Sequence, residues 1–416
     1  MNGAGLPARQ TSEVKRLVAD CTMSSRLRML AALDRREPDH TPCSFMLYNG
    51  LKATCHSYSE FIERQVAMGL DAVVELPPRP PVVTNDHYNL HGLPVSYDRR
   101  VRIAEWTEHP PDEELPILVR EYRTPAGTLR AEVRRTPDWR WGNHVPFLDD
   151  YIVPRSRRFL VTQPSDLAAL RYLLVPPKKE EIEAFHAEAQ PALRLAERHG
   201  LLVSGGWGVG ADLVGWIHGL INMVYTSHDQ PEFLQEMLDI IATWNRQRME
   251  VVLAAGVDLY IKRAWYENLD FWSPASWRRY LYPILKADVE LAHERGARFG
   301  YIITSNCMPL LDMFAELEID ALIGVDPLQY DLAATKASLA GKVCLWGGIN
   351  GHLVVEHGSA EGVRTAVREA LHVLAPGGGF ILSPVDNVRE ATPQALENAL
   401  TLISEWRRLT GQSDTR

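Results

Sequence analysis

Residues able to hold a thiolate or contact a ligand gather where one predicted strand ends. Tyr301 to Leu311 reads YIITSNCMPLL, in which an apolar strand runs into Thr304, Asn306 and Cys307. A Ser or Asn cap followed by Pro309 is typical of a helix start, and exposed amides there would stabilise a thiolate. Two interpretations stay open: Cys307 as a reactive group, or as a buried cysteine at the start of a helix.

Acidic and amide side chains follow other predicted strands. Asp386 and Asn387 follow GGFILSP, and Asn350 and His352 follow KVCLWGG. The loops after strands are where barrel enzymes bind and transform their ligands. Glu75 ends DAVVEL, and a buried glutamate with a raised pKa is a candidate general base. We therefore expect Asp386 and Glu75, together with the thiol named above, to be catalytic, and the other three residues to bind substrate.

Two cations and two tryptophans complete the candidate substrate-binding set. Lys262 and Arg263 end VDLYIKR, and because side chains alternate along a strand, at most one of them need face a pocket. There it would anchor an anionic group, whereas a salt bridge at the strand end is the alternative. Trp207 and Trp216 lie in GGWGVGADLVGWIHG and would either form aromatic walls for a flat ligand or pack in the core.

The elements that must position these residues follow a regular rhythm. Apolar, β-rich runs predict strands at residues 41–47, 71–76, 201–206, 257–263, 297–303, 320–325, 342–348 and 378–384. Amphipathic segments predict helices at residues 58–69, 211–255, 274–295, after 308, 331–339, 359–374 and 392–409. Strands that alternate with helices pair in parallel through crossover connections. We predict an α/β fold, a (β/α)8 TIM barrel, with an open doubly wound sheet as the alternative.

A β-rich insertion interrupts this rhythm after the second strand. We place it at residues 84–173, within a single barrel domain that spans residues 1–416. Its segment EYRTPAGTLRAEVRR has PAG between two alternating runs, which indicates a hairpin. An insertion in a strand-to-helix loop lies on the carboxyl-terminal face of a barrel, so we expect a lid, a substrate wall or a dimer contact.

Three predicted strands open in the same way. GLDAVV, AGVDLY and EIDALI each place an aspartate, Asp71, Asp258 and Asp320 respectively, directly before an apolar run. We interpret these aspartates as groups on the amino-terminal face of the barrel that stabilise the fold.

Composition and charge limit the class of protein. The chain of 416 residues is 46% hydrophobic and 23% charged, with a net charge of −9, so we expect no nucleic-acid partner. Its five cysteines include no CxxC pair, which argues against disulfides and a structural zinc module. The amino terminus lacks the apolar run of a signal peptide, and no apolar run is long enough to span a membrane. We expect a cytoplasmic protein that acts on a small molecule, with a homodimer as one option.

Several segments together resemble the uroporphyrinogen decarboxylase superfamily, which includes cobalamin-dependent methyltransferases. SRLRMLAALDRREPDHTP resembles the first helix of that superfamily and its entry to strand one. SPASWRRYLYPILKADVELAHERGA resembles its central helix, and PGGGFILSPVDNVREATPQALENAL resembles its last strand, site loop and terminal helix. The resemblance implies a (β/α)8 barrel with a pocket at the carboxyl ends of the strands.

The decarboxylase pattern is altered in this sequence. The resemblance implies an arginine-rich loop after strand one, an aspartate after strand two, a tyrosine in the third unit and a histidine after strand eight. The matching positions hold MLYNGLKA without arginine, Pro77 and Pro78, a segment near Trp216, and Asp386. A carboxylated tetrapyrrole needs cations, so the changes argue against uroporphyrinogen as the substrate.

The methyltransferase pattern is altered as well. The resemblance implies zinc held by a His-x-Cys at the end of strand five and by a cysteine after strand eight, where the metal makes the acceptor a thiolate. The matching positions hold Ile302, Thr304 and Asp386. Either zinc has been lost, or Cys307 and Asp386 build a different site with a histidine; the sequence names no metal ligand set.

Three hypotheses about function follow. The first is an enzyme of the methyltransferase-like branch that moves a one-carbon group between a corrinoid (cobalamin) protein or small donor and a small acceptor. The second is a decarboxylase-like lyase acting on a carboxylated substrate, with Lys262 or Arg263 as its anchor. The third is a catalytically altered barrel that binds a tetrapyrrole or a partner protein. The lost arginines and the aromatic insertion favour the first.

Overall fold

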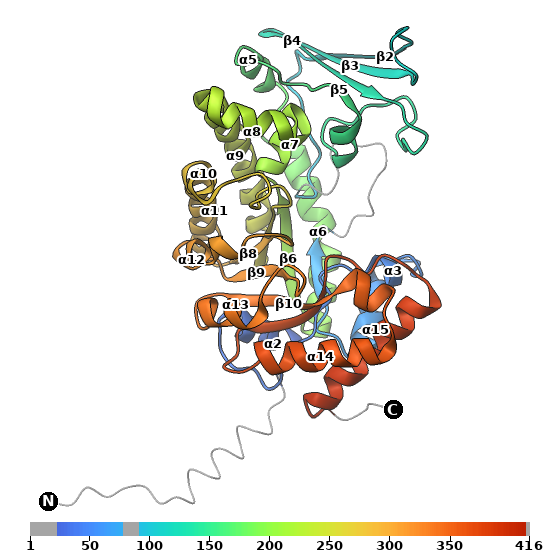
Figure 1. Ribbon diagram of the computed structural model, residues 1–416, viewed down its shortest axis with the longest axis vertical. Coiled ribbons are helices and arrows are strands. Elements are labelled where there is room, and N and C mark those ends of the chain that lie inside the picture. Colours follow the sequence, from blue (N-terminus) through green and yellow to red (C-terminus); the bar gives the residue numbers. More distant parts are fainter. Residues whose placement is uncertain (1–22, 78–90, 413–416) are drawn as a thin grey trace, which may run out of the picture.

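A curled sheet of parallel strands forms the centre of the protein (Figure 1). The computed structural model describes residues 23–77 and 91–412. Neighbouring strands follow the order β1-β6-β7-β8-β9-β10-β11, and every pairing in this sheet is parallel. The strands are β1 (Val73–Leu76), β6 (Leu202–Gly208), β7 (Leu259–Arg263), β8 (Arg298–Ile302), β9 (Ala321–Val325), β10 (Cys344–Asn350) and β11 (Phe380–Val385).

A short segment at Cys43 occupies the eighth position of the ring. Cys43 forms a parallel bridge with Leu382 of β11, and the N–H of Ser44 donates to the Leu382 carbonyl at 3.0 Å. On the other side the N–H of Asp71, just before β1, donates to the Cys43 carbonyl at 2.8 Å. The predicted strand 41–47 is therefore reduced to a bridge, because Pro42 has no N–H to donate and the following residues turn over the barrel interior.

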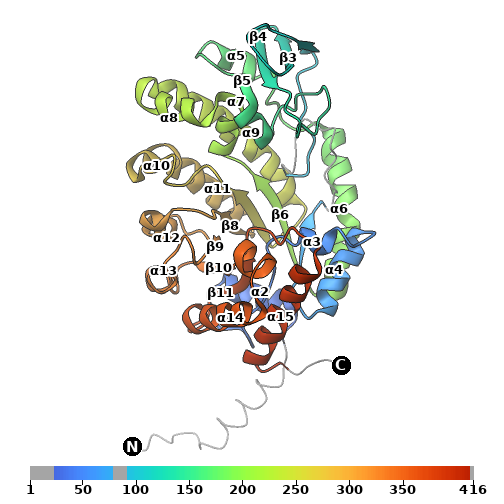
Figure 2. The ribbon, with the colours of Figure 1, turned by 45° about the vertical axis from the view of Figure 1, so that its right-hand side comes forward.

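Helices cover the outside of the strand ring (Figure 2). The helices of the described residues are, in chain order, α2 (Ser25–Leu33), α3 (Asn49–Lys52), α4 (Tyr58–Ala67), α5 (Asp166–Leu170), α6 (Lys179–His199), α7 (Ala211–His218), α8 (Leu220–Asp229), α9 (Pro231–Ala254), α10 (Pro274–Tyr280), α11 (Tyr282–Glu294), α12 (Leu311–Glu316), α13 (Leu332–Leu339), α14 (Ala360–Leu374) and α15 (Pro393–Leu409). Exceptions to the outer position are α2, which closes the amino-terminal end of the barrel, α3, which borders the cavity, and α5, which packs on the insertion. Three short turns of other helical types are η1 (Asp150–Arg155), η2 (Met308–Leu310) and η3 (Gly351–Glu356), the last of them a π-helix.

Two long predicted helices are broken in the structure. The segment 211–255 divides into α7, α8 and α9, because Gly219 takes a left-handed φ of 91° and Pro231 starts a new helix. A Cβ at Gly219 would lie 2.5 Å from Phe159, so only glycine fits this turn. The segment 274–295 divides at Leu281, just before Pro283 in the first turn of α11.

The sequence prediction missed the longest helix of the second unit. Helix α6 spans 21 residues after the insertion and completes the crossover from β1 to β6. Its signals are present in the sequence: acidic Glu180 and Glu181 lie in the first turn, and Gly200 ends the helix in the left-handed conformation. Together with α6 the chain has the predicted eight-unit (β/α)8 arrangement.

Ion pairs fasten the amino-terminal end of the barrel to α2. Asp258, just before β7, accepts three hydrogen bonds from the Arg26 guanidinium, the shortest at 2.6 Å. The same carboxylate accepts the N–H of Val203 in the neighbouring strand at 3.0 Å. The same arrangement occurs twice more. Asp71 accepts hydrogen bonds from Arg28 and from the Cys43 N–H. Asp320 accepts hydrogen bonds from Arg35 and from the Phe299 N–H. The three aspartates thus lie on the stability face, as the sequence predicts.

Apolar residues of α2 fill the same end of the barrel. Met29, Leu30 and Leu33 pack in one buried cluster with inward-facing strand residues such as Leu202 and Ile381. The amino-terminal end is therefore closed by side chains, and space for a ligand is left at the opposite end.

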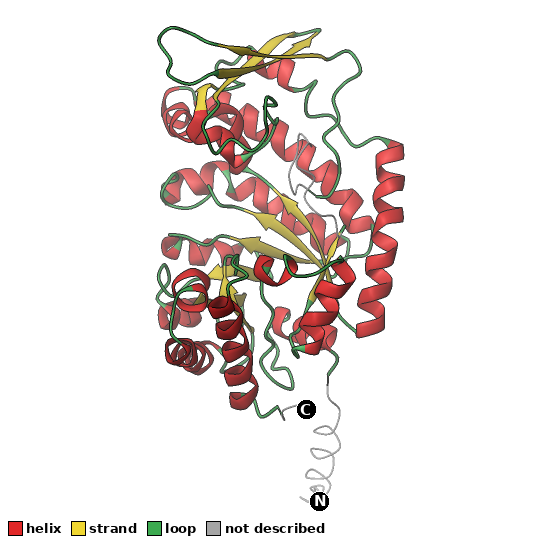
Figure 3. Cartoon of the chain, turned by 90° about the vertical axis from the view of Figure 1, so that its right-hand side faces the viewer, coloured by secondary structure: helices red, strands yellow, loops and turns green. Residues whose placement is uncertain are grey.

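The insertion forms an antiparallel sheet of four strands that is separate from the parallel sheet (Figure 3) and lies beyond α7 and α8 (Figure 1). Its strands are β2 (Arg102–Glu108), β3 (Ile117–Thr124), β4 (Gly127–Arg134) and β5 (Ser156–Arg158). The predicted hairpin is confirmed, with Thr124 paired to Gly127 across the turn. The predicted boundary at residue 84 lies outside the described residues.

The described residues bear on the expectations about membrane spans and cysteines. No described helix has the length and apolar character that a membrane span requires. The four described cysteines are free thiols, and three of them are buried. The predicted lack of a signal peptide concerns residues outside the described part.

The double role of Asp258 leads to a stability prediction. Asp258→Ala removes an ion pair and also leaves the buried Val203 N–H without an acceptor, so we expect the free energy of unfolding to fall by about 2 to 3 kcal/mol. Arg26→Ala removes only the half-exposed partner and should cost about 1 kcal/mol or less. Urea denaturation of both variants measures the difference. Equal losses would show that the amide contact contributes nothing.

Candidate functional site

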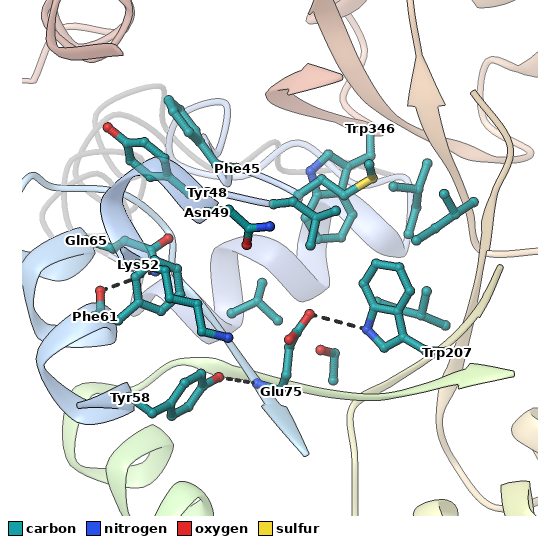
Figure 4. Close-up of a pocket in the computed structure, with 17 residues that line it drawn as sticks. Phe45, Tyr48, Asn49, Lys52, Tyr58, Phe61, Gln65, Glu75, Trp207 and Trp346 are labelled. Carbon is teal, nitrogen blue, oxygen red and sulfur yellow. Dashed lines mark hydrogen bonds between the residues drawn. The ribbon is translucent and has the colours of Figure 1, made fainter. Parts of the chain in front are cut away.

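A cavity opens inside the barrel toward the carboxyl ends of the strands. It contains about 640 Å³ of empty space, part of which is open to solvent. Inward-facing residues of six strands, from Val73 in β1 to Trp346 in β10, form its inner wall. The segment after Cys43, with α3 and α4, forms the remaining side. Six aromatic residues line it: Phe45, Tyr48, Tyr58, Phe61, Trp207 and Trp346 (Figure 4).

Glu75 is the one acidic residue among the described residues that line this cavity. It lies on β1, where Val73 and Glu75 face inward and Val74 and Leu76 pack outward against the main core. Burial raises the pKa of its carboxyl group above the ordinary value, although the charge of Lys52 and a hydrogen bond from Trp207 partly lower it. The carboxyl group can therefore exchange a proton with a ligand closer to neutral pH than an exposed glutamate can.

A β-bulge directs Trp207 toward Glu75. The pairing register between β6 and β7 shifts between Gly206 and Gly208, and Trp207 has a left-handed φ of 61°. Ser204 faces the cavity, so strict alternation would turn Trp207 outward; the extra residue of the bulge turns it inward instead. Its indole Nε1–H donates to Glu75 Oε1 at 3.3 Å. A Cβ at Gly206 would lie 2.4 Å from a backbone oxygen of β7, so glycine permits the bulge.

The cation and the two amides that line the cavity, Lys52, Asn49 and Gln65, come from α3 and α4, where the sequence predicted no site residue. Lys52 ends α3 and extends into the cavity near Glu75 (Figure 4). Tyr58 fixes the strand behind it, because its hydroxyl oxygen accepts the Glu75 N–H at 2.7 Å. Tyr58, Phe61 and Gln65 lie at i, i+3 and i+7 of α4 and form one stripe. That spacing is the sequence signal by which this wall could have been found.

The structure places the predicted anchors Lys262 and Arg263 away from the cavity. Lys262 faces outward, and its Nζ contacts Asp288 at 2.7 Å. Arg263 pairs with Asp212, Nε to Oδ2 at 3.2 Å, and its guanidinium lies over the Trp216 ring at 4.8 Å. Burial raises the pKa of Asp212 to about 7, against the pull of Arg263. Both cations thus form buried ion pairs, and Trp216 packs with them instead of contacting the cavity.

Cys307 and its neighbours also lie outside the cavity. The Cys307 thiol is fully buried and forms a hydrogen bond with the hydroxyl group of Tyr330. Burial raises the pKa of the thiol to about 12, so it stays protonated at neutral pH. Thr304 is half-buried and Asn306 is exposed, and neither lines the cavity. The structure therefore supports the interpretation of Cys307 as a buried residue at a helix start.

The four predicted residues at the end of β10 and in the loops after β10 and β11 form the rim of the barrel. Asp386 pairs with Arg389 in its own loop. The side-chain oxygen of Asn387 accepts the N–H of Asn49 at 3.2 Å. Asn350 donates to Asp326 in the loop after β9, at 2.8 Å, and His352 Nδ1 contacts Glu356 at 2.9 Å. They connect loops with one another and do not line the cavity.

The residues at the positions where the resemblance implies zinc ligands cannot bind zinc in this chain. Ile302 lines the cavity and offers no donor atom. Thr304 lies outside the cavity, and the Asp386 carboxylate is paired with Arg389. Nor are Cys307 and Asp386 part of a common ligand group, since among the described residues only His352, Glu356 and His357 cluster closely enough to hold a metal. No step of the chemistry below uses a metal in the cavity.

A ring of eight parallel strand positions with helices outside and a cavity at the carboxyl ends defines a (β/α)8 barrel. The family model of uroporphyrinogen decarboxylase (URO-D) matches residues 145–406, so this chain belongs to the URO-D family. No curated protein matches the sequence.

Three solved structures that align with this chain differ widely in how well they match. A methyltransferase from Methanosarcina mazei aligns with a TM-score of 0.57 and 17% identity, over 93% of this chain and 99% of that one. A D-psicose 3-epimerase aligns with a TM-score of 0.34 and 9% identity, over 56% and 86% of the two chains. A 3-keto-L-gulonate-6-phosphate decarboxylase from Vibrio cholerae aligns with a TM-score of 0.26 and 13% identity, over 53% and 92%. The first likeness extends over the whole barrel and bears on fold alone.

The raised pKa of Glu75 predicts a pH dependence of stability. An unfolded glutamate ionises near pH 4.3, whereas the folded carboxyl group ionises at a higher pH. Wild-type stability should therefore fall as the pH rises from about 4.3 through the folded pKa. Glu75→Gln has no carboxyl group that ionises at this position. Its free energy of unfolding, relative to that of the wild type, should therefore rise over the same pH interval. Denaturation of both proteins across pH 4 to 8 measures the difference, and a constant difference would contradict the assignment.

The buried Cys307 thiol predicts selective alkylation. In the native protein, iodoacetamide at pH 8 should modify the half-buried Cys55 and leave Cys307 unmodified, because Cys307 is inaccessible and its pKa is about 12. Both should react after denaturation in urea. Peptide mass spectrometry distinguishes the two sites. Rapid modification of Cys307 in the native protein would show that its thiol is accessible and reactive.

Proposed function

We propose that this protein transfers a methyl or other one-carbon group from a corrinoid or small methyl donor to a small acceptor bound in the aromatic cavity. The observation that carries the proposal is the placement of Glu75, the one acidic residue among the described residues that line the cavity, beside six aromatic residues and with a raised pKa. The whole-barrel likeness to a methyltransferase agrees with it at the level of fold.

The cavity residues suit such a transfer. The acceptor, an alcohol, thiol or amine, would place its X–H proton near the Glu75 carboxylate, and the aromatic walls would exclude water from the reacting atoms. As the X–C bond forms, the donor keeps the electron pair of its bond to carbon, and the acceptor proton passes to Glu75. Solvent then removes that proton. Trp207 orients the carboxylate, and Lys52 stabilises its charged form.

The charge of the cavity disfavours the decarboxylase alternative. Lys52 is the only cation among the described residues that line the cavity, since Lys262 and Arg263 are paired elsewhere. Several carboxylates on one substrate would need several cations. A single carboxylate could still bind to Lys52. The decarboxylase function therefore fits the site only for a small substrate with one carboxylate.

A transfer assay tests the proposal. Purified protein is incubated with methylcobalamin and a panel of small thiols, phenols and amines, and methylated products are identified by mass spectrometry. We expect Glu75→Gln to lower kcat by about 10²- to 10⁴-fold, as the loss of a general base does. Trp207→Phe keeps the aromatic wall but loses the hydrogen bond, so it should have a smaller effect.

Cys307→Ala is the matched control, because Cys307 lies outside the cavity and should leave the rate unchanged. Full activity of Glu75→Gln would sink the proposal. Release of CO2 from a carboxylated substrate, without methyl transfer, would identify a decarboxylase. Binding of cobalamin or a tetrapyrrole without turnover of any substrate would identify the non-catalytic barrel.

A further inference from the structure

Two histidines and a glutamate come together on the rim of the barrel, outside the cavity. His352, Glu356 and His357 belong to η3, the π-helical turn that follows β10, and to the residue after it. Their potential ligand atoms all lie within 4.8 Å of one another. None of the three lines the cavity, and none matches a position at which the resemblance described above implies a metal ligand.

The π-helical turn brings the two histidines together. Residues five apart lie on different faces of an α-helix, but an i to i+5 hydrogen bond stacks them. Here the N–H of His357 donates to the carbonyl of His352 at 3.1 Å. As a result the two imidazole rings approach to 4.5 Å between centroids, at an angle of 89°. The backbone thus places two nitrogen ligands side by side in a short segment.

Glu356 adds an oriented, ionised carboxylate. Its side chain is 2% exposed, and Oε1 accepts the backbone N–H groups of Arg389 and Glu390 in the loop after β11. Oε2 contacts His352 Nδ1 at 2.9 Å. Burial alone would raise the pKa of Glu356, but the hydrogen bonds from His352 and the two amides hold it below its ordinary value. Hydrogen bonds of this kind hold a carboxylate ligand in place in metal sites.

We propose that His352, Glu356 and His357 bind one divalent transition-metal ion of the Zn²⁺ class. Two imidazoles and one carboxylate suit such ions, whereas Ca²⁺ and Mg²⁺ take oxygen ligands. Bonds of about 2.0 to 2.2 Å hold two ligand atoms at most about 4.4 Å apart. Small rotations of the exposed imidazoles close the set, and water fills the remaining coordination positions because the His352 side chain is 64% exposed.

The contacts of Glu356 connect this site to the cavity wall. The loop that its carboxylate holds also accepts hydrogen bonds from the start of α3, through Asn387 to the Asn49 N–H and through the Val388 carbonyl to the Gly50 N–H. Asn49 lines the cavity. A bound ion would stiffen the loops after β10 and β11 and, through them, the wall that carries Lys52.

Zinc titration of the full-length protein tests this site. After treatment with a chelator and its removal, wild-type protein should bind one Zn²⁺ per chain in isothermal titration calorimetry. His352→Ala and His357→Ala should each weaken that affinity by about 10-fold or more. Both side chains are exposed, so the variants should fold, and circular dichroism checks that they do. Co²⁺ should give a d–d absorption spectrum in the wild type that both variants lose.

His228→Ala and Cys55→Ser are matched controls. His228 is an exposed histidine of α8, and Cys55 is a half-buried thiol; neither belongs to the cluster. Both should bind Zn²⁺ as the wild type does. Absence of stoichiometric binding to the wild type overturns the proposal, as does equal affinity in the two cluster variants. Binding that Cys55→Ser alone abolishes also overturns it, by assigning the metal to a thiol. None of these outcomes depends on methyl transfer.

Discussion

The fold depends on how the amino-terminal edge of the parallel sheet satisfies its backbone amides. Where adjacent strands are staggered, an N–H group near the start of one strand has no carbonyl beside it, and such a group cannot stay buried without an acceptor. Asp71, Asp258 and Asp320 each supply that acceptor to the preceding strand. The carboxylates then need cations of their own, and α2 with the turn after it provides three arginines. Strand register and helix docking are therefore set by the same groups.

This arrangement assigns different tasks to the two ends of the barrel. The amino-terminal end is filled by Met29, Leu30 and Leu33 and surrounded by ion pairs, so it cannot open without breaking them. The carboxyl-terminal end lacks such a plug, and the strands there end in loops of differing length. A ligand site can form only at this second end, which is where the aromatic cavity lies.

Much of the architecture was predictable because it follows from local patterns. Alternation of apolar strands with amphipathic helices predicted the barrel, and the PAG turn predicted the hairpin of the insertion. Breaks in helices were not predicted where they depend on tertiary contacts: Gly219 is required by the ring of Phe159, which is distant in sequence. The length of the first strand, predicted at residues 41–47, was overestimated. Its extent depends on pairing with β11 on one side and with the residues before β1 on the other, and both are distant in sequence.

The site was predictable only where strand periodicity decides the direction of a side chain. Glu75, a candidate general base in the sequence, faces inward by simple alternation along β1. Trp207 faces inward only because of a bulge. Lys262 and Arg263 could be read as pocket cations because their partners, Asp288 and Asp212, are not adjacent in sequence. The wall formed by α3 and α4 was not predicted, because α3 is a helix of four residues and Lys52 reaches the cavity only through the way α3 packs over the barrel.

The altered metal position and the properties of Glu75 are physically linked. The resemblance implies zinc at the end of strand five, and a dication there would lower the pKa of any carboxyl group across the cavity. In this chain that position is Ile302, which adds apolar surface instead. With the desolvation of Glu75 opposed only by Lys52 and Trp207, its pKa remains raised. An apolar residue at this position therefore favours the raised pKa that the proposed role of Glu75 as a proton acceptor requires.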